Sequence, residues 1–103
     1  MNNNMQKIFA KAQALQAKIA EAQKKLEKEE VSGSSCSGMV SVVITLKGDV
    51  KSISIAKEII NPDEKDILED LILVALNDAK SKADMEYEKG MKEASGGIGI
   101  PGL

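Results

Sequence analysis

The chain has 103 residues, of which 43% are hydrophobic and 29% are charged, a composition that fits a single globular domain. Phe9 and Tyr87 are its two aromatic residues, so the core must be aliphatic and thin, and such chains often gain stability by oligomerising. A net charge of −2 argues against a nucleic-acid partner unless the lysines gather in one place.

The chain carries no sign of export or of membrane insertion. Cys36 is the single cysteine, so no intramolecular disulfide can form. The N-terminus lacks the apolar run of a signal peptide, and no stretch approaches the ~20 apolar residues of a membrane span. We therefore expect a cytoplasmic protein without a membrane partner.

The first predicted element is one long helix over residues 4–28. Its apolar residues recur at alternating steps of three and four, the spacing of a narrow seam along one side of a helix. These residues are Met5, Ile8, Ala12, Leu15, Ile19, Ala22 and Leu26. At 1.5 Å per residue the helix would be about 37 Å long, too long for one small core to cover. Phe9 is interpreted as a core residue.

Residues 29–60 change to the alternating pattern of a small antiparallel meander. We predict a short strand at 31–33, a flexible link at 34–38 and a half-buried strand at 40–46. Gly48 lies in a tight turn, because glycine readily takes a positive φ, and a return strand follows at 50–55. The meander should have one apolar face.

A second long helix is predicted to begin at Asn61 as its N-cap and Pro62 as its first residue. It should run to about Lys89, weaken at Gly90 and continue, frayed, as far as Ala94. Its middle is apolar on every side, more than one sheet face can cover, which predicts a homodimer. The predicted dimer-interface residues are Leu71, Ile72, Val74, Ala75 and Leu76. The fold class is therefore α+β: a single α-β-β-β-α domain over residues 1–94, then a flexible glycine-rich tail over 95–103.

The sequence lacks the commonest general base and the motifs of the common metal and phosphate sites. There is no histidine, one cysteine cannot form a zinc site, and no glycine-rich loop ends in the Lys-Ser/Thr of a phosphate-binding motif. We therefore expect no enzymatic activity, no cofactor, no metal and no small-molecule substrate.

The lysines are concentrated in the first helix, where residues 1–28 carry a net charge of +4 against −6 for the rest of the chain. Lys11, Lys18 and Lys25 repeat every seven residues, and Lys7 lies one turn before Lys11. Such a row can follow a phosphate backbone, although a solvated helix face is the alternative. The chain has no arginine for reading guanine and too few aromatics to stack single-stranded bases, so duplex DNA bound with low sequence specificity is favoured.

Several motifs, taken in order, resemble the YbaB/EbfC family of bacterial nucleoid-associated proteins. They include Val31-Ser32-Gly33, Ile60-Asn61-Pro62-Asp63-Glu64-Lys65, and Glu69-Asp70-Leu71 followed by Ala75-Leu76-Asn77-Asp78-Ala79. The resemblance implies a tweezer-like homodimer that holds duplex DNA in the nucleoid and acts in chromosome organisation and gene regulation. The DNA-binding residues it implies are Lys7, Lys11, Lys18 and Lys25, then Lys24 and Lys28, then Lys80 and Lys82. The alternative is an adaptor or scaffold dimer whose basic helix holds an acidic protein.

Overall fold

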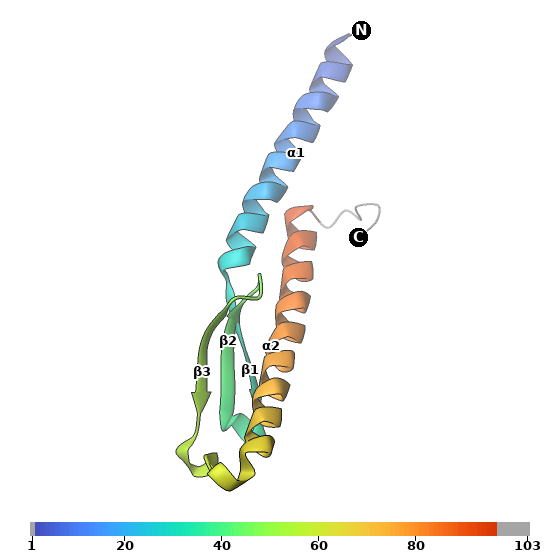
Figure 1. Ribbon diagram of the computed structural model, residues 1–103. Coiled ribbons are helices and arrows are strands. Elements are labelled where there is room, and N and C mark those ends of the chain that lie inside the picture. Colours follow the sequence, from blue (N-terminus) through green and yellow to red (C-terminus); the bar gives the residue numbers. More distant parts are fainter. Residues whose placement is uncertain (1, 97–103) are drawn as a thin grey trace.

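Along the chain, a long helix is followed by a three-stranded antiparallel sheet and then by a second long helix (Figure 1). The second helix packs on one face of the sheet, and the first extends away from it. The computed structural model describes the backbone of residues 2–96 and the side chains of residues 4–96. The main elements are α1 (Asn2–Lys28), β1 (Glu30–Ser35), β2 (Val40–Thr45), β3 (Val50–Ile55) and α2 (Lys65–Ala94). This order confirms the α+β fold class. Most of the predicted tail, residues 97–103, lies outside the described part.

The sheet has the order β1-β2-β3 and separates an apolar face from a polar one. Val42 lies opposite Gly33 on β1 and Ile53 on β3, so these three residues share one face. On that face Val40, Val42 and Ile44 are buried beneath α2. The opposite face carries the exposed serines Ser32, Ser52 and Ser54. Alternation along each strand thus produces the predicted apolar face.

The backbones of β1 and α2 approach each other closely at Gly33. A Cβ atom placed on Gly33 would overlap with backbone atoms of Ala75 and Ala79. Ala75, Ala79 and Ala83 recur every four residues, so they form a smooth stripe on the side of α2 that faces the sheet. Beside this contact, the Ser35 hydroxyl donates to the carbonyl oxygen of Leu71 at 2.6 Å. Small residues on both elements therefore fix α2 over β1 and β2.

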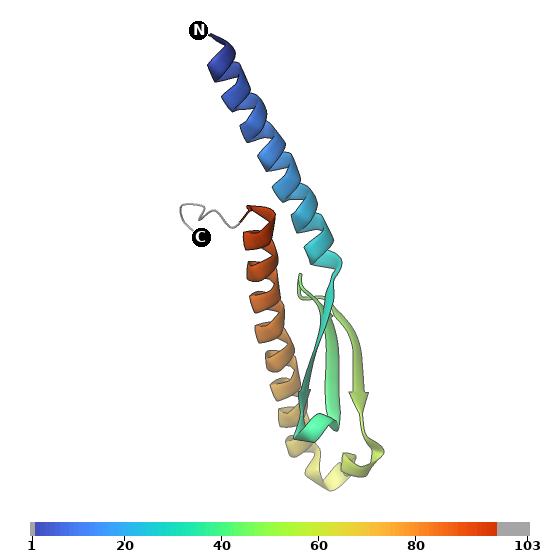
Figure 2. The same ribbon diagram turned by 180° about the vertical axis from the view of Figure 1, so that it is seen from behind.

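Only the end of α1 belongs to this core. Leu26 is 9% exposed, and its methyl groups fill the space where Gly90 of α2 has no side chain. Every described side chain from residue 4 to residue 18 is exposed. The predicted core position of Phe9 is wrong, because its side chain is 63% exposed. The seam cannot be buried within one chain, since α1 extends past the end of α2 (Figures 1 and 2).

The projecting helix makes the molecule long and thin. It measures 77 × 20 × 17 Å and has a radius of gyration of 20.2 Å, against about 13 Å for a compact chain of this size. Neither helix within residues 2–96 is apolar over a length that would cross a bilayer. We call residues 4–18 of α1 the arm.

Two predicted boundaries differ from the structure. The link predicted at 34–38 is ordered: Ser34 and Ser35 belong to β1, and Cys36–Gly38 form a 3-10 turn. The second helix continues through Gly90 to Ala94, the far end that the sequence allowed, and Leu26 packs against it at Gly90. Its start is also shifted: Asn61 caps a 3-10 turn at Pro62–Glu64 by accepting from the Asp63 N–H at 3.0 Å, and α2 begins at Lys65.

The close approach at Gly33 predicts that Gly33→Ala destabilises the fold. The added methyl meets backbone rather than a flexible side chain, so we expect a loss of at least about 2 kcal/mol in the free energy of unfolding. Ser32→Ala is the matched control, because its exposed side chain lies on the other face of the same strand. Urea denaturation followed by circular dichroism measures both. Equal midpoints for Gly33→Ala and wild type would contradict this packing.

Candidate nucleic-acid interface

Helix α1 presents a row of free ammonium groups, three of them on the arm and the fourth, Lys25, between the arm and the body. Lys7, Lys11, Lys18 and Lys25 are all exposed, and at about 100° per residue they lie within roughly 40° of one another around the helix axis. No carboxylate in the described part of the chain comes within 4.0 Å of their Nζ atoms, since the ion pairs found there both lie within α2. The row is thus available to an anionic partner along the whole projecting helix.

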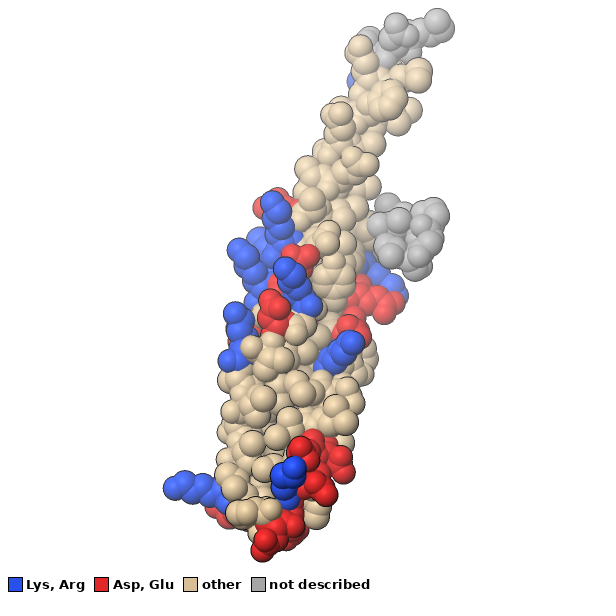
Figure 3. All heavy atoms as spheres, in the orientation of Figure 1, with Lys and Arg blue, Asp and Glu red and all other residues tan. Residues whose placement is uncertain are grey.

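A second group of lysines lies at the base of the arm. Lys24 and Lys28 are exposed on an adjacent side of α1. They line a depression together with Lys47 and Lys51, which flank the turn between β2 and β3. Figure 3 shows lysines gathered there, with carboxylates between them, where α1 meets the sheet. Sequence reasoning missed Lys47 and Lys51, because nothing local in the sequence places this turn beside the end of α1.

The two α2 lysines proposed from the sequence have other surroundings. Lys82 forms an ion pair with Asp78, with 3.1 Å between Nζ and Oδ2. Lys80 lines a groove between α2 and β3 and lies outside both lysine groups described above. Lys82 therefore has a neighbouring carboxylate that competes for its charge, unlike the lysines of the arm.

Asp78 links α2 to the edge of the sheet. Its Oδ2 accepts from the Ser34 backbone N–H at 3.0 Å and also pairs with Lys82. The hydrogen bond from Ser34, followed by the bond to Lys82, lowers the pKa of Asp78 below its usual value of 3.8. Asp78 and Lys82 are thus engaged in contacts within the fold: Asp78 with the Ser34 N–H and with Lys82, and Lys82 with Asp78.

Carboxylates concentrate at the opposite end of the molecule. Between residues 57 and 70 there are six carboxylates and two lysines, and all eight side chains are exposed. Figure 3 shows this acidic end around the start of α2, far from the arm. The charge distribution thus favours a polyanion at the arm end of the long axis and disfavours one at the opposite end.

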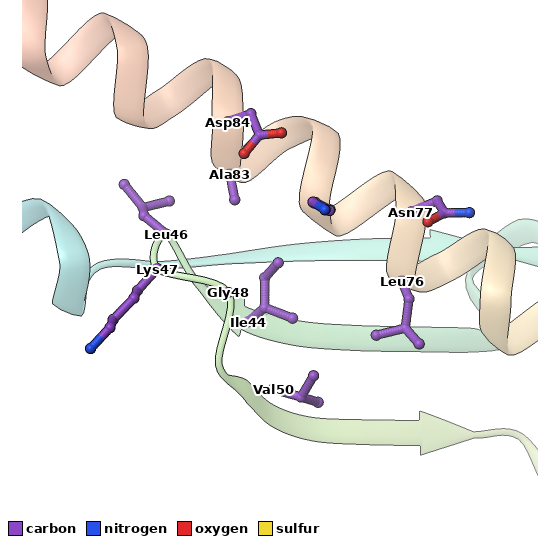
Figure 4. A pocket seen from close by; sticks show the side chains of 10 residues that line it. Ile44, Leu46, Lys47, Gly48, Val50, Leu76, Asn77, Ala83 and Asp84 are labelled. Atoms are coloured by element: carbon purple, nitrogen blue, oxygen red, sulfur yellow. The ribbon is translucent and has the colours of Figure 1, made fainter.

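The groove between α2 and β3 is lined by both apolar and polar side chains. Ile44, Val50 and Leu76 point into it, whereas Lys47 points away (Figure 4). Asn77, Lys80 and Asp84 of α2 also line it. The groove exists because α2 covers β1 and β2 but leaves β3 open. Outside its lining, Ile53 on β3 is 48% exposed and Leu73 on α2 is 56% exposed, so further apolar surface remains on both elements.

The residues predicted for the dimer interface divide into three groups. Val74 is exposed, while Leu71, Ile72 and Leu76 are half-buried against the core. The prediction that Ala75 lies in the dimer interface needs correction, because Ala75 is fully buried against Gly33 of its own chain and has no surface left for a partner. When a helix carries apolar residues on every side, the sequence does not reveal which side packs on the sheet of the same chain.

Comparison with known proteins identifies the family to which the chain is similar. The model of the YbaB/EbfC DNA-binding family matches residues 1–98. A nucleoid-associated protein of Maricaulis maris is 44% identical over 94 residues, covering 91% of this chain and 88% of that protein. A nucleoid-associated protein of Rhodospirillum rubrum is 41% identical over 98 residues, covering 95% and 92%.

The fold also matches a solved structure. The crystal structure of an uncharacterized protein of Helicobacter pylori superposes with a TM-score of 0.68 over 89% of this chain and 94% of that one, at 17% identity. At this identity the likeness concerns the fold alone.

The surroundings of Asp78 predict a pH-dependent contribution to stability. Because its pKa is lowered in the folded state, the contribution is present above the unfolded value near 3.8 and is lost as the pH falls through the folded value. Asp78→Asn should therefore lower the unfolding midpoint at neutral pH, and the difference from wild type should shrink below pH ~4. Thermal melts across this range test it. A difference that stays constant down to pH ~2 would contradict the ionic role.

Proposed function

The chain belongs to the YbaB/EbfC DNA-binding family, and from this premise we propose that it binds duplex DNA as a homodimer with low sequence specificity. The main support for the proposal is the row of unpaired lysines along α1, formed by Lys7, Lys11, Lys18 and Lys25. Successive members Lys11, Lys18 and Lys25 are seven residues apart, about 10 Å along the helix. Long lysine side chains at this spacing reach phosphates of one backbone and release the counterions bound there.

The low sequence specificity follows from the kinds of side chain available. The chain has no arginine, so it lacks the planar fork that reads guanine in the major groove. Lysine contacts to phosphate hold the duplex without reading its bases. The family is one of DNA-binding proteins rather than enzymes, and we assign the chain no catalytic role.

A second copy of the chain is proposed to cover the groove between α2 and β3. Outside its lining, Leu73 on α2 and Ile53 on β3 are about half exposed, and Val50 within the groove adds to this apolar surface. A helix is about 10 Å wide, roughly two strand spacings, so α2 alone cannot cover three strands. A partner seated here would shield the open side of α2, and the dimer would present two arms in place of one. Two arms double the phosphate contacts, which strengthens binding that one arm makes weakly.

The cellular setting is proposed from the relatives, which are named nucleoid-associated proteins. A duplex-binding dimer without base recognition would act along the chromosome. We therefore propose the nucleoid as its location, and chromosome organisation with effects on gene regulation as its role.

The exposed apolar seam of the arm favours a second candidate function. Met5, Ile8 and Leu15 are exposed beside the lysine row, a surface that also fits an amphipathic helix with acidic flanks. The chain would then be an adaptor. Affinity capture with and without nuclease separates the two functions, because one stoichiometric protein partner that survives nuclease treatment would favour the adaptor.

Reversing two charges of the row should weaken DNA binding. We expect Lys11→Glu with Lys18→Glu to lower the affinity for random-sequence duplex at least about tenfold at ~0.1 M salt, since two phosphate contacts become repulsive. Glutamate and lysine have similar helix propensities, so helical content should be retained. Fluorescence anisotropy over a salt series is the measurement, and the wild-type affinity should fall steeply with salt.

The matched control reverses two lysines at the acidic end, Lys57→Glu with Lys65→Glu. This control changes the net charge equally and should leave binding nearly unchanged. Binding by the Lys11/Lys18 variant at wild-type strength, or wild-type binding that does not respond to salt, would refute the proposal.

A charge on the exposed apolar side of β3 should separate the dimer. Ile53→Lys places an ammonium group on that side, which we expect to yield a monomer in sedimentation or light scattering at micromolar concentration. Ser54→Lys, its neighbour on the polar face of β3, should remain dimeric. A monomeric wild-type protein, or an Ile53→Lys variant that stays dimeric, would contradict this interface.

A further inference from the structure

The turn between β2 and β3 lies beside the end of α1 (Figures 1 and 2). The contact is direct, because the Leu46 N–H donates to the carbonyl oxygen of Glu29 at 2.8 Å, and the Glu29 N–H donates to Leu26 in the last turn of α1. The turn itself is fixed by the Gly48 and Asp49 N–H groups, which both donate to Thr45. Lys47 and Lys51 are therefore held near the base of the arm by an ordered hairpin.

Four lysines and three carboxylates line the depression between these elements. The lysines are Lys24, Lys28, Lys47 and Lys51, and the carboxylates are Glu27, Glu30 and Asp49. Within residues 4–96 none of these carboxylates comes within 4.0 Å of a lysine Nζ, because the ion pairs of that region lie elsewhere. Glu27 is half-buried and accepts instead from the Gln23 side-chain amide at 3.3 Å. All four lysine side chains are exposed, so their charges remain available.

The surroundings of the depression favour an extended polyanion. Lys28 lies less than one turn beyond Lys25, the last lysine of the row on α1, and about 60° from it around the helix axis, so the depression adjoins the end of that row. Lys51 is the extra residue of a bulge in β3 and lines the depression with Thr45 and Glu30, which pair with each other on the sheet face opposite α2. That face carries exposed serines and no helix, which leaves it open to a rod as wide as duplex DNA.

We propose that Lys47 and Lys51, with Lys24 and Lys28, form a second phosphate-contact site at the base of the arm. The ligand is the sugar-phosphate backbone of the same duplex that the arm binds, so the inference rests on the proposed function. The arm and the hairpin hold the duplex at two places, which restricts its direction relative to the long axis. Neither contact reads bases.

The test removes the hairpin charges without touching α1. We expect Lys47→Gln with Lys51→Gln to weaken binding of a random-sequence duplex about tenfold at ~0.1 M salt. The slope of log affinity against log salt should become shallower by about 2 for each chain in contact, since each phosphate contact contributes roughly 0.9. Lys57→Gln with Lys65→Gln is the control for net charge and should leave both quantities unchanged. Circular dichroism checks that all variants are folded.

The outcomes separate the two proposals. Wild-type affinity and salt slope in the Lys47/Lys51 variant, together with strong binding by the wild-type protein, would overturn the second contact and leave the arm as the interface. Equal losses in the Lys47/Lys51 variant and in the control would also overturn it, because net charge alone would then explain the effect. A wild-type protein that binds no duplex would overturn the proposed function itself.

Discussion

The contact of Gly33 with the alanine stripe of α2 determines which surfaces the molecule leaves open. Because the two backbones meet without intervening side chains, α2 lies directly over β1 and β2. One helix cannot then reach β3, whose apolar residues border an open groove. The same packing sets the position along α2 at which Leu26 meets Gly90, and residues 2–18 of α1 project beyond the body. The open groove and the arm are both consequences of this one close approach.

Charge is distributed along the long axis in a way that fits this architecture. The lysines of α1 and of the hairpin occupy the arm and its base, while the carboxylates gather around the start of α2. A slightly acidic chain can thus present a basic surface, because the opposing charges are separated by much of a 77 Å molecule. This separation exceeds the screening length of about 8 Å at physiological salt, so the two ends act independently on a nearby polyanion. Net charge alone would have argued against DNA binding.

The parts of the structure that depend on local geometry could be predicted from the sequence. The period of the apolar residues identified α1, the meander and α2, and the seven-residue repeat placed Lys11, Lys18 and Lys25 on one side of a helix. Neither inference requires knowing what the helix packs against. For this reason the fold class and the arrangement of the lysine row follow from the sequence alone.

The parts that depend on tertiary contacts could not be predicted in this way. Phe9 was assigned to the core because aromatic residues are usually buried, but it lies on a helix that leaves the body. Ala75 was assigned to the dimer interface, because a helix that is apolar on every side does not reveal which side packs on the sheet of its own chain. Lys47 and Lys51 were overlooked because their nearest partners, Lys24 and Lys28, are about 20 residues away in sequence. In each case the missing information was the position of one element relative to another.

Lysine footprinting tests whether duplex DNA contacts the lysine row of α1, because it measures the ammonium groups themselves. The protein is acetylated briefly with and without random-sequence duplex, and the modification of each lysine is read by mass spectrometry. The account predicts that duplex slows acetylation of Lys7, Lys11, Lys18 and Lys25, while Lys57 and Lys65 react at an unchanged rate. Protection spread evenly over all lysines, or concentrated at the acidic end, would contradict the assignment of the arm as the DNA-binding surface.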